Sequence, residues 1–136
     1  MEAANREERN AETIRRLWAA SSRGGTEAVL DLLDDHACWR LHIAPGRTLT
    51  TRELGDTLRR LERNRRIAAA HLSRLEAAGD RVFAGGSFRW VADDGGLIDF
   101  HGYWVYDFED GRLVSGQSFA SRAEALAAFG RAAVNT

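Results

Sequence analysis

The candidate for proton chemistry in this chain is His71, which stands in the apolar frame of a predicted strand. A neutral imidazole in an apolar pocket can act as a general base near pH 7. Ser73, Ser118 and Tyr106 are placed to orient it or to bind a substrate oxygen. No acid partner is evident, so a core histidine that only donates a hydrogen bond to the backbone or to a ligand is the alternative interpretation.

The large aromatic side chains predict a pocket wall, because they share the inward frame of their strands. The candidate ligand-binding residues are Trp18, Trp39, Leu41, Ser73, Phe88, Trp90, Phe100, Trp104, Tyr106 and Ser118. Gly86 and Gly102 stand in the same frames, where a missing side chain leaves room. We therefore expect an apolar small-molecule pocket, with an aromatic core that fills the space as the alternative.

The opposite frames carry charge and imidazole. Asp99 and His101 are expected to face outward, although a β-bulge near Gly102 would turn one of them inward. His42 falls in the outward frame of the first strand. His42 and His101 can meet if their strands are neighbours, but no close metal-ligand spacing is present, so we expect no metal and no cofactor.

Composition bounds the function. The 136 residues fit one domain spanning 1–136, and 44% hydrophobic residues are enough for a core. All 19 basic residues are arginine and the net charge is −1, which favours neither nucleic acid nor an anionic membrane. Cys38 is the single cysteine, so an internal disulfide is excluded. The N-terminus is charged and no apolar run is long enough to span a membrane, so we expect a soluble bacterial protein of the cytoplasm.

The elements that position these residues follow from periodicity and turn signals. We expect helices over 5–23, 26–34 and 50–66, strands over 37–43, 67–77, 81–92, 96–108 and 112–120, and a final helix from Ser121. Gly24 is the expected left-handed cap of the first helix. Thr50 with Glu53 and Ser121 with Glu124 have capping-box spacing. The order α-α-β-α-β-β-β-β-α predicts an α+β fold, a curved antiparallel sheet with helices on its concave side.

This order resembles the nuclear transport factor 2-like cone fold, and within it the SnoaL-like polyketide cyclase group. The stretches that carry the likeness are 14–20 (IRRLWAA), 32–40 (LLDDHACWR), 78–82 (AGDRV), 108–113 (FEDGRL) and Phe119. The likeness covers nearly the whole chain. Its motifs are loose one by one, and their order and spacing are specific for the fold. The resemblance implies a ligand pocket, while the superfamily holds both enzymes and non-enzymes.

The residues that carry the family's known reactions are missing here. The positions of the ketosteroid isomerase base and oxyanion donors hold Leu41, Leu17 and Ile98, or Asp99 with a slip of one. The positions of the limonene-epoxide hydrolase residues hold Trp39, Leu41, Gly86, Phe88 and Ser118. The resemblance therefore supports the pocket and argues against those two reactions.

Three functions stay open. The first is binding of a small, mostly apolar, cyclic molecule with cofactor-independent isomerase, cyclase or dehydratase chemistry, in which His71 moves the proton. The second is a non-catalytic ligand-binding or accessory module, and the third is a purely structural dimer module whose pocket is filled by its own side chains. We also expect a homodimer through the convex sheet face, where an apolar set is predicted to lie. That set is Leu72, Phe83, Val91, Tyr103 and Val105.

Overall fold

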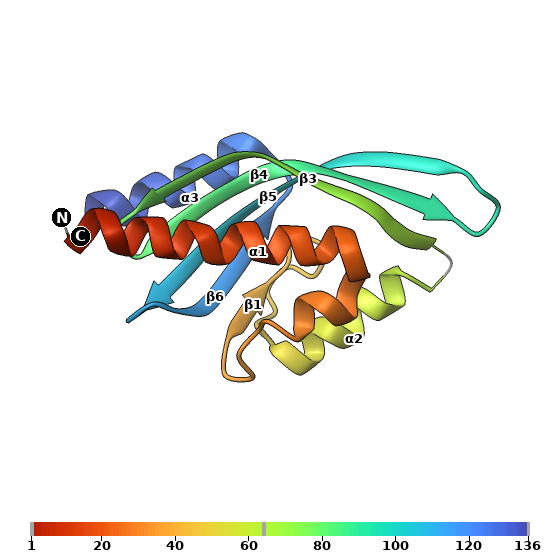
Figure 1. Ribbon diagram of the computed structural model, residues 1–136, viewed down its shortest axis with the longest axis horizontal. Helices are drawn as coiled ribbons and strands as arrows, with labels where there is room; N and C mark the ends of the chain where they lie inside the picture. Colours follow the sequence, from red (N-terminus) through yellow and green to blue (C-terminus); the bar gives the residue numbers. More distant parts are fainter. Residues whose placement is uncertain (1, 64, 136) are drawn as a thin grey trace.

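A six-stranded curved sheet forms the frame of the molecule, with its strands in the order β2-β1-β6-β5-β4-β3 (Figure 1). The computed structural model describes residues 2–63 and 65–135. Its elements are α1 (Glu2–Leu30), β1 (Cys38–Arg40), β2 (Leu49–Thr50), α2 (Thr51–Leu61), β3 (Arg65–Ala78), β4 (Arg81–Ala92), β5 (Leu97–Glu109), β6 (Arg112–Phe119) and α3 (Arg122–Asn135). The strands β3 to β6 form successive antiparallel hairpins, and β1 runs parallel to β6. The predicted α+β fold and element order are confirmed.

The predicted start and stop signals hold at most of these elements. The first helical segment bends at Gly25, which has φ 64° and ψ −147°, so α1 consists of two helices as expected, with Gly25 rather than Gly24 in the unusual conformation. Thr50 and Glu53 form a complete capping box at the start of α2. Asp110 and Gly111 both have positive φ, as a tight hairpin turn between β5 and β6 requires. The first strand is shorter than expected, because pairing with β6 ends at Arg40.

Two β-bulges in β3 change which of its residues face the concave side. The pairing with β4 shifts by one residue between Ile67 and Ala69, and again between Leu72 and Arg74. Each extra residue turns the following side chains to the opposite face. Ala70 and Leu72 therefore pack against the core, between the two bulges. Regular alternation along this strand, which predicted that His71 and Ser73 face inward, is therefore wrong between the two bulges.

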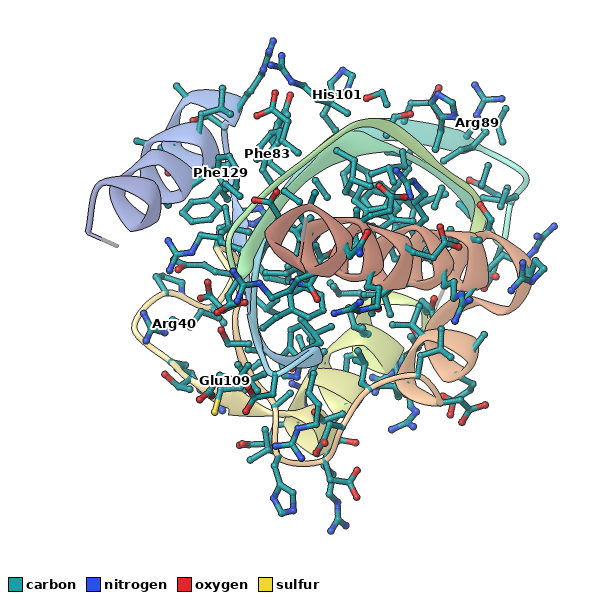
Figure 2. All side chains as sticks on the ribbon, turned by 60° about the vertical axis from the view of Figure 1, so that its left-hand side comes forward. Arg40, Phe83, Arg89, His101, Glu109 and Phe129 are labelled. Carbon is teal, nitrogen blue, oxygen red and sulfur yellow. The ribbon has the colours of Figure 1, made fainter. Side chains whose placement is uncertain are left out.

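The long helix α1 covers the concave face and the free edge of β3 (Figures 1 and 2). Ser22 of α1 both accepts from the Ala70 amide at 2.7 Å and donates to the Ala70 carbonyl at 2.8 Å. Trp18 stacks on Phe88 with 4.8 Å between ring centroids, and its indole N–H donates to the Tyr106 hydroxyl at 3.3 Å. These contacts fix the height of α1 above the sheet.

The last helix, α3, lies on the convex face (Figure 2). Phe83 and Val105 are buried beneath it, and Phe83 meets Phe129 with 6.1 Å between ring centroids. Arg81 joins sheet and helix, because it bonds Asp107 at 2.6 Å and the Ala128 carbonyl at 2.8 Å. Two of the five residues expected to be exposed on the convex face are therefore covered by the chain itself.

Leu72, a third member of that set, is also misplaced by the prediction. It packs against the concave core because the first bulge of β3 reverses its direction. Among the described residues, no helix is both long and apolar enough to cross a membrane.

The close approach of α1 to the sheet makes Gly86 sensitive to any added side chain. A Cβ atom there would lie 2.7 Å from Trp18 Cζ3 and closer still to the backbone carbonyl oxygen of His71. We expect Gly86→Ala to lower the free energy of unfolding by about 2 kcal/mol or more, because neither neighbour can yield without moving a strand or α1. Urea unfolding followed by circular dichroism measures this.

Gly130→Ala is the matched control, since a Cβ at that helical position meets nothing within 4 Å. We expect it to be neutral or slightly stabilising, because alanine favours helix over glycine. Equal stability of the two variants would contradict the packing described for Trp18.

Candidate functional site

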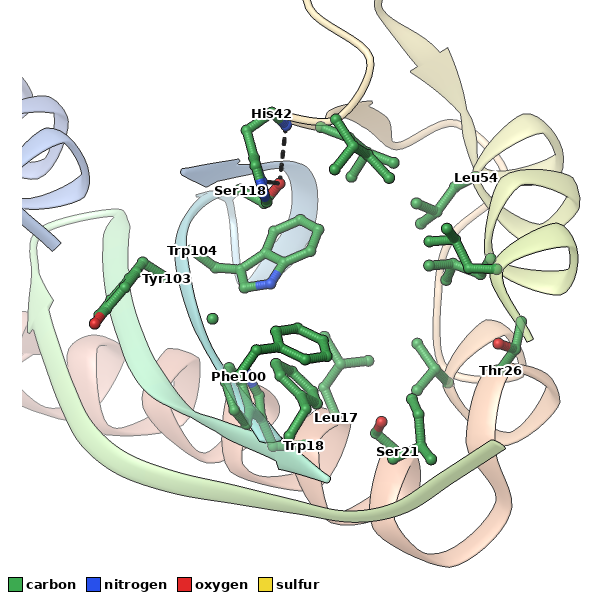
Figure 3. Close-up of a pocket in the computed structure, with 18 of the residues that line it drawn as sticks. Leu17, Trp18, Ser21, Thr26, His42, Leu54, Phe100, Tyr103, Trp104 and Ser118 are labelled. Atoms are coloured by element: carbon green, nitrogen blue, oxygen red, sulfur yellow. Dashed lines mark hydrogen bonds between the residues drawn. The ribbon is translucent and has the colours of Figure 1, made fainter. Parts of the chain in front are cut away.

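A cavity of about 410 Å³ lies between the concave face of the sheet and the helices α1 and α2 (Figure 3). Aromatic side chains line its sheet side, and aliphatic side chains line its helix side. The aromatic lining includes Trp39, Phe88, Trp90, Phe100, Trp104 and Tyr106, with Trp18 from α1. The aliphatic lining includes Leu17, Val29, Leu33, Leu54, Leu58 and Leu61. Nine of the ten candidate ligand-binding residues line this cavity, and Ser73 is the exception.

The aromatic wall is a continuous row of stacked rings. Trp18 stacks on Phe88, Phe88 on Phe100 and Phe100 on Trp90, with centroid distances of 4.8, 5.4 and 5.9 Å. Trp104 lies nearly parallel to Tyr106, at 7° and 5.6 Å. Rings that already pack on one another lose little further freedom when a ligand binds, so this wall is preformed.

The space left by two glycines is used by the protein's own rings. The missing side chain of Gly86 accommodates Trp18, and that of Gly102 accommodates Phe88, whose Cε2 would lie 2.5 Å from an added Cβ. The sequence suggested that these glycines leave room in the cavity, but they do not enlarge it. They let the aromatic rings lie flat against the sheet.

The mouth of the cavity is apolar and open to solvent. Ile43, Ile98 and Phe100 line the cavity while being 53%, 46% and 42% exposed. Large apolar side chains so exposed beside a cavity are typical of a ligand entrance.

Tyr106 supplies a neutral hydroxyl at the cavity wall. Its side chain is buried, and burial raises the pKa of the phenol well above its ordinary value, with the Trp18 hydrogen bond acting in the opposite direction. The oxygen accepts from the Trp18 indole, so the Tyr106 proton is available as a donor.

His42 and Ser118 form a hydrogen-bonded pair in the lining (Figure 3). His42 Nδ1 lies 2.9 Å from Ser118 Oγ, and the backbone N–H of His42 donates to the same oxygen at 3.1 Å. Ser118 is buried, whereas His42 is exposed. In either tautomer the ring nitrogen Nε2 stays free, as a base or as a donor.

The sequence did not predict that His42 would line the cavity. Alternation along a strand places it outward, but β1 ends at Arg40, so that rule stops two residues earlier. The chain then turns through hydrogen bonds that include Ala44 N–H to the Leu41 carbonyl, and this turn directs His42 toward β6. No local signal in the sequence marks this end of β1, because the strand ends where its pairing with β6 ends.

The predicted placement of His71 inside the cavity is wrong. His71 is exposed, is paired with Ser87 of β4, and does not line the cavity, because the bulge after Ile67 turns it to the convex side. Ser73 is exposed as well and donates to the Gly85 carbonyl at 3.1 Å. It occupies the second bulge of β3.

Asp99 faces outward, as expected, and forms an ion pair with Arg89 at 2.8 Å. The hydrogen bonds from Arg89 lower the pKa of the Asp99 carboxyl. The pairing of β4 with β5 is regular from Arg81 to Val91, so the alternative of a bulge near Gly102 is not realised. His101 borders the cavity region, but its side chain lies on the outer side of the sheet beside Tyr103 (Figure 2).

Within residues 2–63 and 65–135, no group of three histidine, cysteine, aspartate or glutamate side chains is arranged to hold a metal ion. His42 faces Ser118 and His101 faces Tyr103. The site that the described residues form is therefore an apolar cavity with a tyrosine hydroxyl and a histidine–serine pair.

Comparison with solved structures supports the fold. A nuclear transport factor 2-like protein of unknown function from Burkholderia pseudomallei is 24% identical, with 88% of this chain and 95% of that chain covered and a TM-score of 0.68. A putative SnoaL-like polyketide cyclase from Jannaschia is 14% identical, with 89% and 90% covered and a TM-score of 0.66. An epoxide hydrolase from M. tuberculosis, similar to limonene-epoxide hydrolase, is 15% identical, with 94% of each chain covered and a TM-score of 0.67. At these identities the likeness is one of fold.

Comparison of the sequence gives the family. No curated protein sequence matches this chain. The model of the SnoaL-like domain matches residues 14–116, about three quarters of the 136 residues. The protein is therefore a member of the SnoaL-like domain family.

Proposed function

We propose that this protein binds a small, mostly apolar, cyclic molecule in the cavity between the sheet and the helices α1 and α2. The observation that carries the proposal is the row of stacked rings from Trp18 through Phe88 and Phe100 to Trp90. Such a row lines one side of an open cavity with apolar aromatic surface. Flat rings are the ligands that a wall of stacked aromatic side chains binds best.

The size of the cavity supports a ligand of a few fused rings. About 410 Å³ lies within the range of about 300 to 1,000 Å³ that is usual for small-molecule sites. The aliphatic helix side faces the aromatic sheet side, so a planar molecule between them would bury apolar surface away from water on both of its faces. That burial provides the main free energy of binding.

The few polar atoms of the lining limit the polarity of the ligand. Ser21, Thr26, Tyr106 and Ser118 are buried at the wall. The Tyr106 hydroxyl remains a neutral donor, which suits a carbonyl or phenolic oxygen better than a second donor. The ligand is therefore expected to carry a small number of oxygens on an apolar skeleton.

Tryptophan fluorescence tests binding, because all four tryptophans line the cavity. The panel contains steroids, terpenoids, polycyclic aromatics and aromatic polyketides. We expect a saturable change with at least one class. Phe100→Ala should lower the affinity for that ligand by about tenfold, since it removes one ring of the stack at the mouth of the cavity.

Leu97→Ala is the matched control on the same strand, because Leu97 is 61% exposed and does not line the cavity. It should leave the affinity within threefold. No saturable response across the panel, or equal losses in both variants, would contradict the proposed binding site.

A second candidate function is cofactor-independent acid/base catalysis on the bound molecule, in which His42 replaces His71 as the proton carrier. The supporting observation is the His42–Ser118 contact at the cavity wall. The pair also borders a neighbouring hollow lined by Arg40, Gln117 and Glu124, so its proton can exchange with solvent. Isomerisation, cyclisation and dehydration each need such a group to take a proton from carbon or oxygen and return it.

Product analysis by liquid chromatography and mass spectrometry separates catalysis from binding alone. If the ligand is converted, we expect His42→Ala to lower turnover at least a hundredfold with affinity within threefold. His71→Ala, an exposed histidine outside the cavity, should retain turnover. A ligand recovered unchanged after long incubation would establish the non-catalytic function, and a His42→Ala loss within threefold would end the role of His42.

We also propose a homodimer through the part of the convex sheet that α3 leaves uncovered. Val91 and Leu97 pair across β4 and β5 in that part, and Leu97 is 61% exposed. Sedimentation velocity at micromolar concentration should give a dimer that Leu97→Arg disrupts. Leu32→Arg, at a leucine that is 55% exposed and lies away from the sheet, should not change the dimer. A wild-type monomer at this concentration would overturn the proposal.

A further inference from the structure

One cationic side chain lines the otherwise apolar cavity. Arg65 is the first residue of β3. Among the residues that the structure describes, it is the only arginine, aspartate or glutamate that lines the cavity. A charged group beside Leu61, Ile67 and Ile98 is costly unless something compensates it. The nature of that compensation indicates what the cavity accepts.

The protein itself satisfies only part of the Arg65 guanidinium. Its Nε donates to the Leu61 carbonyl at 2.7 Å, and its Cζ lies 5.2 Å from the centre of the Trp90 ring. Among the described residues, no carboxylate lies within ion-pair distance of Arg65, whereas Arg59, Arg81 and Arg89 each have one. No described residue accepts a hydrogen bond from its two terminal nitrogens, Nη1 and Nη2.

A second hydrogen-bond donor at this end of the cavity also lacks an acceptor among the described residues. Trp90 is 7% exposed, and its indole Nε1 is buried without a hydrogen-bond partner among the described residues. Guanidinium and indole N–H groups only donate. This end of the cavity therefore offers N–H donors and a positive charge, and the Leu61 carbonyl accepts from only one of those donors, Arg65 Nε.

Arg65 and the His42–Ser118 pair lie on opposite walls. Arg65 belongs to β3, at one edge of the sheet, and His42 follows β1, which is separated from β3 by β6, β5 and β4. Four strand spacings amount to roughly 19 Å along a flat sheet, and less across a curved one. A molecule fixed at Arg65 would thus extend along the stacked rings toward His42.

We propose that the cavity selects cyclic molecules that carry a carboxylate, and that Arg65 binds this carboxylate while it stays stacked on Trp90. The inference rests on the proposed function and names its ligand class. A guanidinium stacks through its face and donates through its edge, so both contacts are compatible. Two free terminal nitrogens match the two oxygens of one carboxylate, and a single positive charge balances its single negative charge.

Isothermal titration calorimetry with 2-naphthoate and its neutral isostere 2-naphthamide tests the proposal. The same pair of groups on anthracene covers a larger ring. We expect the wild type to bind the carboxylate at least tenfold more tightly than the amide of the same ring. Arg65→Met keeps an apolar stem against Trp90, and it should abolish this preference while amide affinity stays within threefold. If Arg65 acted in packing alone, Arg65→Met would instead weaken the binding of both compounds equally.

Arg66→Gln is the matched control, since Arg66 is the next residue and is exposed. It should retain the preference. Arg65→Gln serves as a second variant if Arg65→Met does not fold, and the wild-type preference itself requires no variant.

The failures of the two proposals differ. Equal binding of carboxylate and amide to the wild type, or a preference that persists in both Arg65 variants, would overturn the role of Arg65 and leave the cavity as a neutral-ligand site. The role of Arg65 would also be overturned if the carboxylate preference disappeared in His42→Gln and persisted in the Arg65 variants. Failure of every ring compound to bind the wild type would overturn the proposed function together with this inference.

Discussion

The position of Trp18 is the constraint on which the rest of the structure depends. Its ring lies against Gly86, stacks on Phe88 and donates to Tyr106, so one side chain of α1 contacts β4 and β5 at once. Because Gly86 has no side chain, the indole approaches the sheet closely, and α1 sits at a fixed height above it. That height sets the depth of the cavity, which opens beside Trp18 rather than beneath it. The same ring begins the aromatic row that continues through Phe88, so the contact that closes the core also builds the binding wall.

The cavity divides its chemistry between two ends. An apolar slot with an aromatic and an aliphatic side occupies the middle. It contributes to affinity but does not fix the orientation of a ligand. The groups that give direction are Arg65 at one wall and the His42–Ser118 pair at the other. The buried phenol of Tyr106 is a neutral donor, since burial raises its pKa and keeps it protonated. A ligand with one polar end would therefore be held in a single orientation, which proton transfer by one histidine requires.

Much of this arrangement could be predicted from the sequence, because alternation and turn chemistry are local. The frame of Phe88, Trp90, Phe100 and Trp104 followed from alternation in two long strands that pair without a bulge. The three alanines at 68–70 gave no alternation to read, so the first bulge of β3 was invisible and His71 was assigned to the wrong face. His42 was missed because the end of β1 depends on its pairing with β6, a contact distant in the chain. The convex position of α3 was missed for a related reason. A helix with one apolar stripe fits either face, and the choice rests on tertiary partners such as Phe83 and Ala128.

The most direct test of whether the aromatic cavity is a ligand site is the response of the four indole N–H signals in a ¹H–¹⁵N correlation spectrum. Each signal is assigned with a single Trp→Phe variant and is then followed during titration with a polycyclic aromatic ligand. We expect saturable shifts with one common dissociation constant at Trp18, Trp90 and Trp104, and unchanged backbone signals at His71 and Ser87 on the convex face. Indole signals that stay fixed while convex-face signals move would contradict this expectation.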